Sequence, residues 1–136
     1  MALITWTSKY SVGVQMLDDQ HKGLINVLNE FHAASMRGKA RGVASPLIRQ
    51  MVSKASEHFA AEESLMESIR FPGLAEHRAK HKKLAGKVAE FVARHEKGDA
   101  TMYTQLLYFM RDWLINHMLT LDSEYASWLA SHGIQS

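Results

Sequence analysis

The chain has no cysteine, only two prolines and eight glycines in 136 residues, and a formal net charge of only +2. The absence of cysteine excludes disulfide bonds and thiolate metal sites. So little glycine and proline is atypical of a disordered chain, and the small net charge indicates no nucleic-acid partner. No apolar run reaches the ~18–20 residues that span a bilayer, and residues 1–17 carry no export signal. We therefore expect one cytoplasmic domain, residues 1–136, without direct membrane insertion.

Apolar residues recur at helical spacing in four long segments, at about 18–37, 45–69, 74–96 and 100–119. We expect a non-helical arm before them, at about 1–17, and a short helix after them, at about 123–131. The breaks between the segments are short, which forces consecutive helices to run antiparallel. The sequence therefore predicts an all-α fold, an antiparallel up-down-up-down four-helix bundle with a non-helical N-terminal arm and a short C-terminal helix.

The first two helices have recognisable start signals. Asp18 is a candidate N-cap of the first helix, because its side chain can accept a hydrogen bond from a free amide of the first turn. Ser45 followed by Pro46 predicts the start of the second helix, with a capping residue and then a proline in the first helical position. The stretch from Arg37 to Gly42 is expected to separate the two helices.

Every predicted helix places ionisable residues inside its apolar stripe, where burial of an unpaired charge is costly. The set comprises five histidines and two carboxylates: His21, His58, Glu62, His77, His81, His117 and Asp122. Two pairs within this set are four residues apart, so their Cβ atoms lie about 5–6 Å apart on one helix face. A single histidine on an apolar face is usually a hydrogen-bonded core residue. Four helices that each turn such residues inward favour instead a centre of two metal ions.

Asp122 does not follow the helical pattern of His117. It lies five positions further along the chain, which is about 140° around a regular α-helix. If Asp122 is a ligand, the fourth helix must break or form a π-bulge between about Met118 and Asp122. Asp122 is also a candidate N-cap of the short final helix, and the two roles are compatible.

Several short motifs occur in a characteristic order along the chain. They are Trp6 with Val12-Gly13-Val14, Asp18-x-Gln20-His21, His58-Phe59-x-x-Glu62-Glu63, Phe71-Pro72, His77-x3-His81 and Trp113-x3-His117-x4-Asp122. Any one of them is weak evidence, but their combined order and spacing are specific. The chain resembles the hemerythrin family, in its single-domain bacterial type, over essentially its whole length. One mild departure is Phe71, where relatives often have tyrosine.

The resemblance implies two non-haem iron ions (Fe²⁺/Fe³⁺), of which one is held by three histidines and the other by two. By the family pattern, His77, His81 and His117 hold the first iron, His21 and His58 hold the second, and Glu62 and Asp122 bridge them. An oxo or hydroxo group would form a third bridge. The iron with two histidines would keep an open position for O2.

The resemblance also implies an apolar pocket over that open position. Its residues, each within one turn of a ligand position, are Leu24, Phe59, Trp113, Leu114 and Met118. A dry pocket would slow the access of protons, which would otherwise release the bound oxygen in reduced form and leave the centre oxidised. Ordinary core packing explains the same residues equally well. Gln20, beside His21, is a candidate hydrogen-bond partner of a ligand.

The expected function is reversible O2 binding for carriage, storage or delivery, with an oxygen-consuming enzyme as a candidate recipient and no catalytic residues. The formal charge of the centre favours O2 binding over oxidation chemistry. Two carboxylates and a hydroxide do not fully neutralise two ferrous ions, and a cationic site does not favour high-valent iron. The chain also lacks the Glu-x-x-His motif of di-iron oxidases. The alternatives are a di-iron enzyme that handles peroxide, ferrous iron or nitric oxide, oxygen sensing through a partner, and a metal-free helical interaction module.

Overall fold

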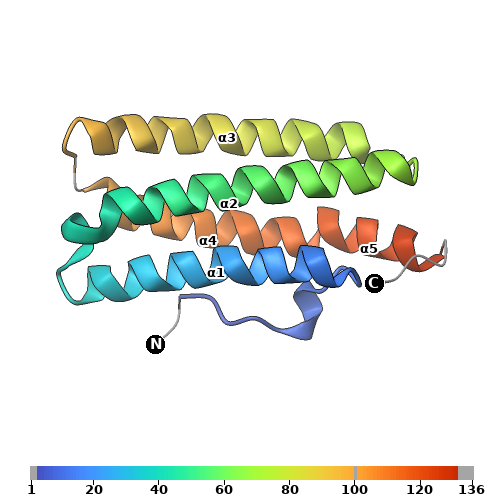
Figure 1. Ribbon diagram of the computed structural model, residues 1–136, viewed down its shortest axis with the longest axis horizontal. Coiled ribbons are helices and arrows are strands. Elements are labelled where there is room, and N and C mark those ends of the chain that lie inside the picture. The colour runs from blue at the N-terminus through green and yellow to red at the C-terminus, as the bar shows by residue number, and fades with distance from the viewer. Residues whose placement is uncertain (1–2, 100, 132–136) are drawn as a thin grey trace.

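The computed structural model describes residues 3–99 and 101–131, apart from the side chain of residue 121. Its helices are α1 (Gln15–Met36), α2 (Ala40–Ser68), α3 (Leu74–Glu96), α4 (Met102–Leu119) and α5 (Leu121–Ser131). The first four lie side by side and run in alternating directions along the long axis, and α5 extends beyond α4 (Figure 1). The predicted up-down-up-down four-helix bundle is confirmed. Among residues 3–99 and 101–131, none of the helices combines the length and the apolar composition of a membrane span.

Three of the turns between helices depend on a residue in the left-handed conformation. Gly38, Arg70 and Gly98 have φ angles of 70°, 58° and 82°. In each turn the next amide bonds back across the end of the helix, as the Lys39 amide does to the carbonyl of Ala34 at 2.8 Å. Glycine adopts this conformation without a steric penalty, whereas an L-residue such as Arg70 pays roughly 1–2 kcal/mol.

The first helix begins earlier than predicted, and Asp18 is not its N-cap. Helix α1 starts at Gln15, and Val14 in the cap position makes no side-chain hydrogen bond to the helix. The carboxylate of Asp18 accepts hydrogen bonds from the Val12 amide at 2.8 Å and from the Ser11 hydroxyl at 2.5 Å instead. Asp18 therefore stabilises the end of the arm. Its carboxylate accepts hydrogen bonds from the arm instead of from the free amides of the first helical turn.

The prediction that α2 starts at Ser45 and Pro46 is also wrong. The helix begins at Ala40 and contains Pro46 in its interior, so one intrahelical hydrogen bond is lost there. Packing explains the extension, since Ala44 is fully buried and both Ala40 and Val43 contact the main core. The break between α1 and α2 is confined to residues 37–39.

The N-terminal arm is mostly extended, with one 3-10 turn at Ser8–Tyr10. It runs alongside α1 in the opposite direction (Figure 1). The side-chain amide of Asn29 holds it in place, because it accepts from the Ile4 amide at 2.9 Å and donates to the Ile4 carbonyl at 2.8 Å.

Helix α3 ends at Glu96, where the sequence predicts its end. Helix α4 begins at Met102, and residue 100, where we expected it to start, lies outside the residues described. It ends at Leu119, and Thr120, with φ −110° and ψ −80°, interrupts the helical path before α5 begins two residues earlier than expected. The irregularity predicted between Met118 and Asp122 is therefore present.

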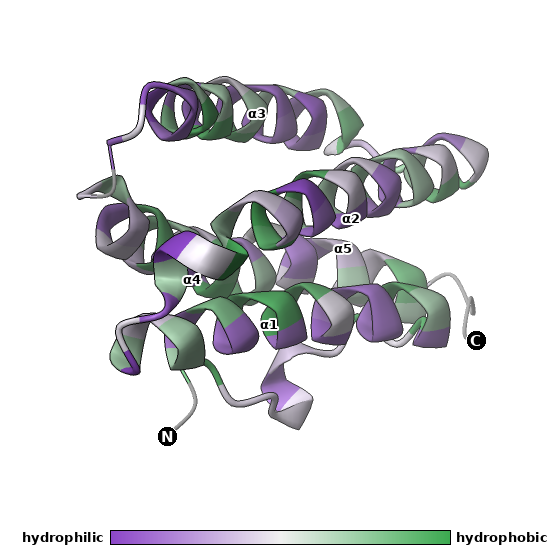
Figure 2. Cartoon of the chain, turned by 60° about the vertical axis from the view of Figure 1, so that its left-hand side comes forward, coloured by the Kyte–Doolittle hydropathy of each residue, from purple (hydrophilic) through white to green (hydrophobic). Residues whose placement is uncertain are grey.

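Apolar residues form two buried clusters, separated along the helices by the ionisable set. Figure 2 shows hydrophilic and apolar residues alternating along α1 and α3, as expected for amphipathic helices. On α1, Leu17 belongs to the smaller cluster and Leu24 to the larger one, while His21 lies between them. On α2, Met66 and Met51 flank the ionisable residues in the same way. The candidate site is thus enclosed on both sides by hydrocarbon.

Candidate metal centre

All seven residues singled out in the sequence are buried in one place inside the bundle. They come from all five α-helices in the described residues, and none of them is more than 5% exposed. The seven are His21, His58, Glu62, His77, His81, His117 and Asp122. Below, His77, His81 and His117 are called the histidine trio, and His21 and His58 the histidine pair. Such complete burial of ionisable groups requires charge compensation at the centre.

The two carboxylates each turn one oxygen toward the trio and the other toward the pair. Asp122 Oδ1 lies 3.0 Å from His77 Nε2 and 3.1 Å from His117 Nε2, whereas Oδ2 lies 3.3 Å from His21 Nε2. Glu62 Oε1 lies 3.1 Å from His81 Nε2, whereas Glu62 Oε2 faces the pair, 3.3 Å from His58 Nε2. This is the arrangement that two bridging carboxylates would adopt.

The break at Thr120 is what brings Asp122 into the centre. Without it, Asp122 would point about 140° away from His117 on a continuous helix. With α5 starting afresh at residue 121, the carboxylate of Asp122 is fully buried and reaches both histidine groups. The change of helical phase at Thr120 is therefore required for Asp122 to join the other candidate ligands.

Two of the histidines are held in orientation from outside the centre. Gln20 Oε1 lies 2.8 Å from His58 Nδ1, and Glu63 Oε2 lies 2.8 Å from His81 Nδ1. An amide or carboxylate oxygen can only accept, so Nδ1 of each ring donates and Nε2 keeps its lone pair for the centre. The candidate role of Gln20 thus has a geometric basis, with His58 rather than His21 as its partner.

Glu63 and Arg78 are functional candidates that the sequence reasoning missed. The guanidinium of Arg78 donates to Glu63 at 3.2 Å and to Glu67 at 3.3 Å, so it fixes the carboxylate that holds His81. Glu63 belongs to the motif after His58. However, its contact is with a different helix, and only the packing of α2 against α3 reveals it.

The electrostatics of the metal-free centre depend on the carboxylates. Burial alone would lower the pKa of His117, but the close approach of Asp122 and Glu62 outweighs it and raises that pKa to about 9. Burial lowers the pKa of His58. Burial works against ionisation of Glu62 and Asp122, yet the surrounding histidine nitrogens hold both pKa values below their usual range. The carboxylates are therefore ionised and available as ligands.

Buried atoms without a hydrogen-bond partner provide an internal test of metal binding. They include both oxygens of Glu62, Oδ2 of Asp122 and Nε2 of His21 and His58. These atoms face one another at short distances but are not aligned for hydrogen bonds. Each unsatisfied buried group costs about 1–3 kcal/mol, and cations coordinated by these atoms would remove that cost. Imidazole and carboxylate are suitable ligands for iron, so the donor set fits the implied metal.

The expected O2-pocket residues occupy two different environments. Leu24, Leu114 and Met118 are buried in the larger apolar cluster. Phe59 and Trp113 are half-buried and lie against the trio, since Phe59 stacks on His81 at 3.9 Å between ring centroids and Trp113 stacks on His117 at 4.5 Å. These two rings therefore cover the side of the centre where three histidines meet, although Phe59 also lies 6.1 Å from the ring of His58.

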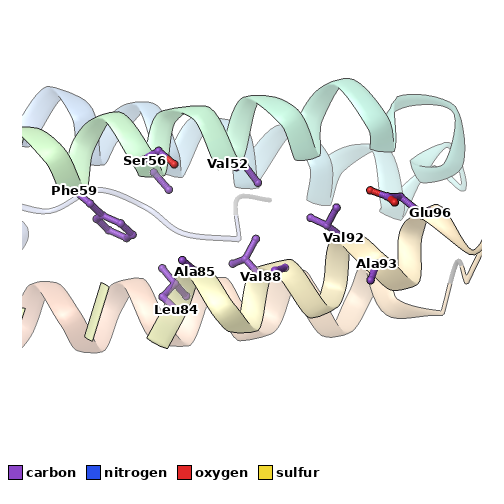
Figure 3. Close-up of a pocket in the computed structure, with 11 residues that line it drawn as sticks. Val52, Ser56, Phe59, Leu84, Ala85, Val88, Val92, Ala93 and Glu96 are labelled. Carbon is purple, nitrogen blue, oxygen red and sulfur yellow. The ribbon is translucent and has the colours of Figure 1, made fainter. Parts of the chain in front are cut away.

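An apolar groove of about 370 Å³ between α2 and α3 leads to Phe59 (Figure 3). Small and branched side chains line it, including Val52, Leu84, Val88 and Val92. The ring of Phe59 thus lines this groove and also stacks on His81, one of the candidate ligands.

Comparisons with known proteins agree with this geometry. The family model described as the hemerythrin HHE cation binding domain matches residues 12–129. A bacteriohemerythrin of Stenotrophomonas maltophilia is 32% identical over 97% of this chain and 85% of its own length. One from Methylococcus capsulatus is 31% identical over 96% of this chain and 100% of its own. Among solved structures, a wild-type hemerythrin matches with a TM-score of 0.85 at 31% identity, covering 93% of this chain and 97% of that one.

Proposed function

Because the chain belongs to the hemerythrin family, we propose that it binds O2 reversibly at a non-haem di-iron centre formed by its seven buried histidines and carboxylates. The observation that supports this most directly is the division of the carboxylate oxygens between the trio and the pair. A carboxylate with one oxygen on each side can bridge two ions, whereas a single-ion site would gather its donors around one point.

The proposed ligand sets are unequal. The trio would hold one iron and the pair the other, with Glu62 and Asp122 as bridges and an oxo or hydroxo group as a third bridge. When bound, the two ferrous ions would supply the electrons and the open coordination position that O2 binding requires. The iron held by the pair has fewer protein ligands and is therefore the one expected to take O2.

The protein's own side chains orient the donors and exclude water. Gln20 and Glu63 fix two imidazole rings so that Nε2 faces the centre. Leu24, Leu114 and Met118 provide buried hydrocarbon, which limits the access of protons and water to bound oxygen.

We assign the protein to oxygen carriage, storage or delivery rather than to catalysis. The centre offers two carboxylates against five histidines, so it stabilises high-valent iron less than the carboxylate-rich sites of di-iron oxidases do. An oxygen-consuming enzyme is the proposed recipient of delivered O2.

An optical experiment tests this function. Iron-loaded protein, reduced anaerobically and then exposed to air, should gain a visible charge-transfer absorption band and lose it when oxygen is removed, over several cycles. His58→Ala should abolish the band, because it removes a proposed ligand of the iron with the open position. Rapid one-way oxidation with turnover of an added substrate would indicate an enzyme, and retention of zinc alone would contradict the proposal.

A further inference from the structure

Trp113 connects the candidate centre to the protein surface. Its indole ring is nearly parallel to the imidazole of His117, with centroids 4.5 Å apart and planes inclined by 14°. Trp113 is only half-buried and lines two grooves between α3 and the segment formed by α4 and α5. His117 lines the second groove and, at 5% exposure, is the most exposed of the seven candidate ligands. Trp113 therefore contacts a candidate ligand and also lines the surface grooves.

Three lysines of α3 line the same grooves as Trp113. Lys80 lines both grooves, while Lys83 and Lys87 line the first. Lys87 pairs with Glu90 at 3.4 Å. Among residues 3–99 and 101–131, neither Lys80 nor Lys83 forms an ion pair, and both are exposed. We call Trp113 with Lys80, Lys83 and Lys87 the lysine–tryptophan face.

Helix α3 carries a net positive charge. This helix has six lysine or arginine residues and three glutamates, so it carries +3, whereas the whole chain carries +2. Of the acidic residues on these grooves, Glu90 lines the first and is paired with Lys87, whereas Glu76 and Glu124 line only the second. An apolar aromatic ring inside a local basic patch is complementary to an acidic protein surface, which long-range attraction would steer toward it.

We propose that the lysine–tryptophan face docks an acidic one-electron carrier protein, and that Trp113 conducts its electrons to the iron held by His117. This inference rests on the proposed function. If bound oxygen leaves as hydrogen peroxide, it takes two electrons from the irons and two protons from solvent, and both irons become ferric. Two encounters with the reduced carrier return both irons to the ferrous state, and each encounter oxidises one carrier by one electron.

The geometry favours an electron carrier over other acidic partners. Electron transfer slows steeply with distance, and a donor on Trp113 would be separated from His117 only by the contact between two stacked rings. Complexes between redox proteins are small, usually below about 1,200 Å² of buried surface, and short-lived. A patch of three lysines beside one aromatic ring suits an interface of that size, whereas a nucleic acid is usually bound by a longer basic stripe.

The docking test uses the oxidised, iron-loaded protein and a reduced acidic [2Fe–2S] ferredoxin as the probe, mixed anaerobically. Lys80→Glu with Lys83→Glu should lower the second-order rate constant for reduction roughly tenfold at low ionic strength, and the matching pair of glutamine substitutions should lower it less. The difference should shrink at about 0.5 M salt, where screening acts within a few ångströms. Reduction by the small methyl viologen radical, which needs no docking, should not slow.

A matched charge reversal provides the control. Lys39→Glu with Arg41→Glu makes the same change in net charge at the N-terminal end of α2, and should leave reduction by ferredoxin at the wild-type rate. In ¹⁵N spectra, ferredoxin should shift the amides of residues 80–87 and 113 in the wild-type protein. Equal rates of reduction for the two charge-reversal variants would overturn the proposal, as would binding of duplex DNA or anionic vesicles to this face more tightly than ferredoxin. If the iron-loaded wild-type protein does not bind O2 reversibly, the proposed function is refuted instead.

Trp113 is tested separately from docking. Trp113→Leu should slow electron transfer at saturating ferredoxin without weakening the affinity for ferredoxin, and Trp113→Phe should retain most of the wild-type rate because it keeps an aromatic ring. Iron content and the rate with methyl viologen serve to normalise each variant. An unchanged saturated rate in Trp113→Leu would exclude this residue as the route.

Discussion

Replacing Glu63 with glutamine tests whether residues outside the centre control its affinity for iron. The carboxylate of Glu63 accepts a hydrogen bond from His81 Nδ1 at 2.8 Å and is itself held by Arg78. Glutamine can accept the same hydrogen bond, but it lacks the negative charge that makes His81 Nε2 a stronger donor to a metal. We therefore expect weaker ferrous iron binding with little change in the fold.

The size of the effect follows from this contact. Loss of an outer partner of a ligand histidine usually costs 10- to 100-fold in metal affinity. Because glutamine preserves the hydrogen bond and Glu63 is 25% exposed to screening solvent, the effect of Glu63→Gln should lie near the lower limit. That is about tenfold, or about 1.4 kcal/mol of binding free energy. Glu63→Ala, which also removes the hydrogen bond, should approach the upper limit.

The assay is anaerobic competition for ferrous iron against a coloured chelator. Glu67→Gln is the matched control, because Glu67 also contacts Arg78 but is 70% exposed and touches no candidate ligand. It removes the same charge one helical turn away and should leave the affinity within a factor of about two of wild type. Equal affinities for the Glu63→Gln, Glu63→Ala and wild-type proteins would refute the role assigned to Glu63.

Two further predictions concern a turn and a titration. Arg70→Gly should raise the free energy of unfolding by about 0.5–1 kcal/mol in urea titrations. Glycine removes the steric strain of the left-handed backbone at residue 70, which exceeds the added entropy of the unfolded chain. A lower free energy of unfolding would show that contacts of the arginine side chain outweigh this strain. Although burial lowers it, contact with Asp122 and Glu62 raises the pKa of His117 to about 9 in the metal-free protein. Iron must displace that proton, so the affinity for ferrous iron should rise with pH, about tenfold per unit, and level off above about pH 9. A flat profile between pH 7 and 9 would contradict this assignment.

The positions of the seven candidate ligands could be predicted because helical spacing decides which residues share a buried face. His58 with Glu62, and His77 with His81, need nothing beyond that spacing to point inward together. Asp122 was out of phase with this pattern, and the break that the sequence required is found at Thr120. Their roles as ligands to particular irons stay predictions.

Helix starts and supporting contacts were harder to predict because tertiary packing decides them. The sequence contains capping residues at Asp18 and Ser45. However, Asp18 bonds to the N-terminal arm instead, and α2 begins before Ser45 because Ala44 is buried in the core. The contact of Glu63 with His81 joins two helices, and no local pattern identifies which residues will face each other across them.

The most direct test of the central claim is the iron content and Mössbauer spectrum of the oxygenated protein loaded with ⁵⁷Fe. Two unequal ligand sets, the trio and the pair, predict two irons per chain and two quadrupole doublets of equal area. His58→Ala should lower the iron content preferentially at the site of the pair and remove one doublet. A single iron per chain, or a wild-type spectrum in the His58→Ala protein, would contradict the assignment of the seven residues to two distinct irons.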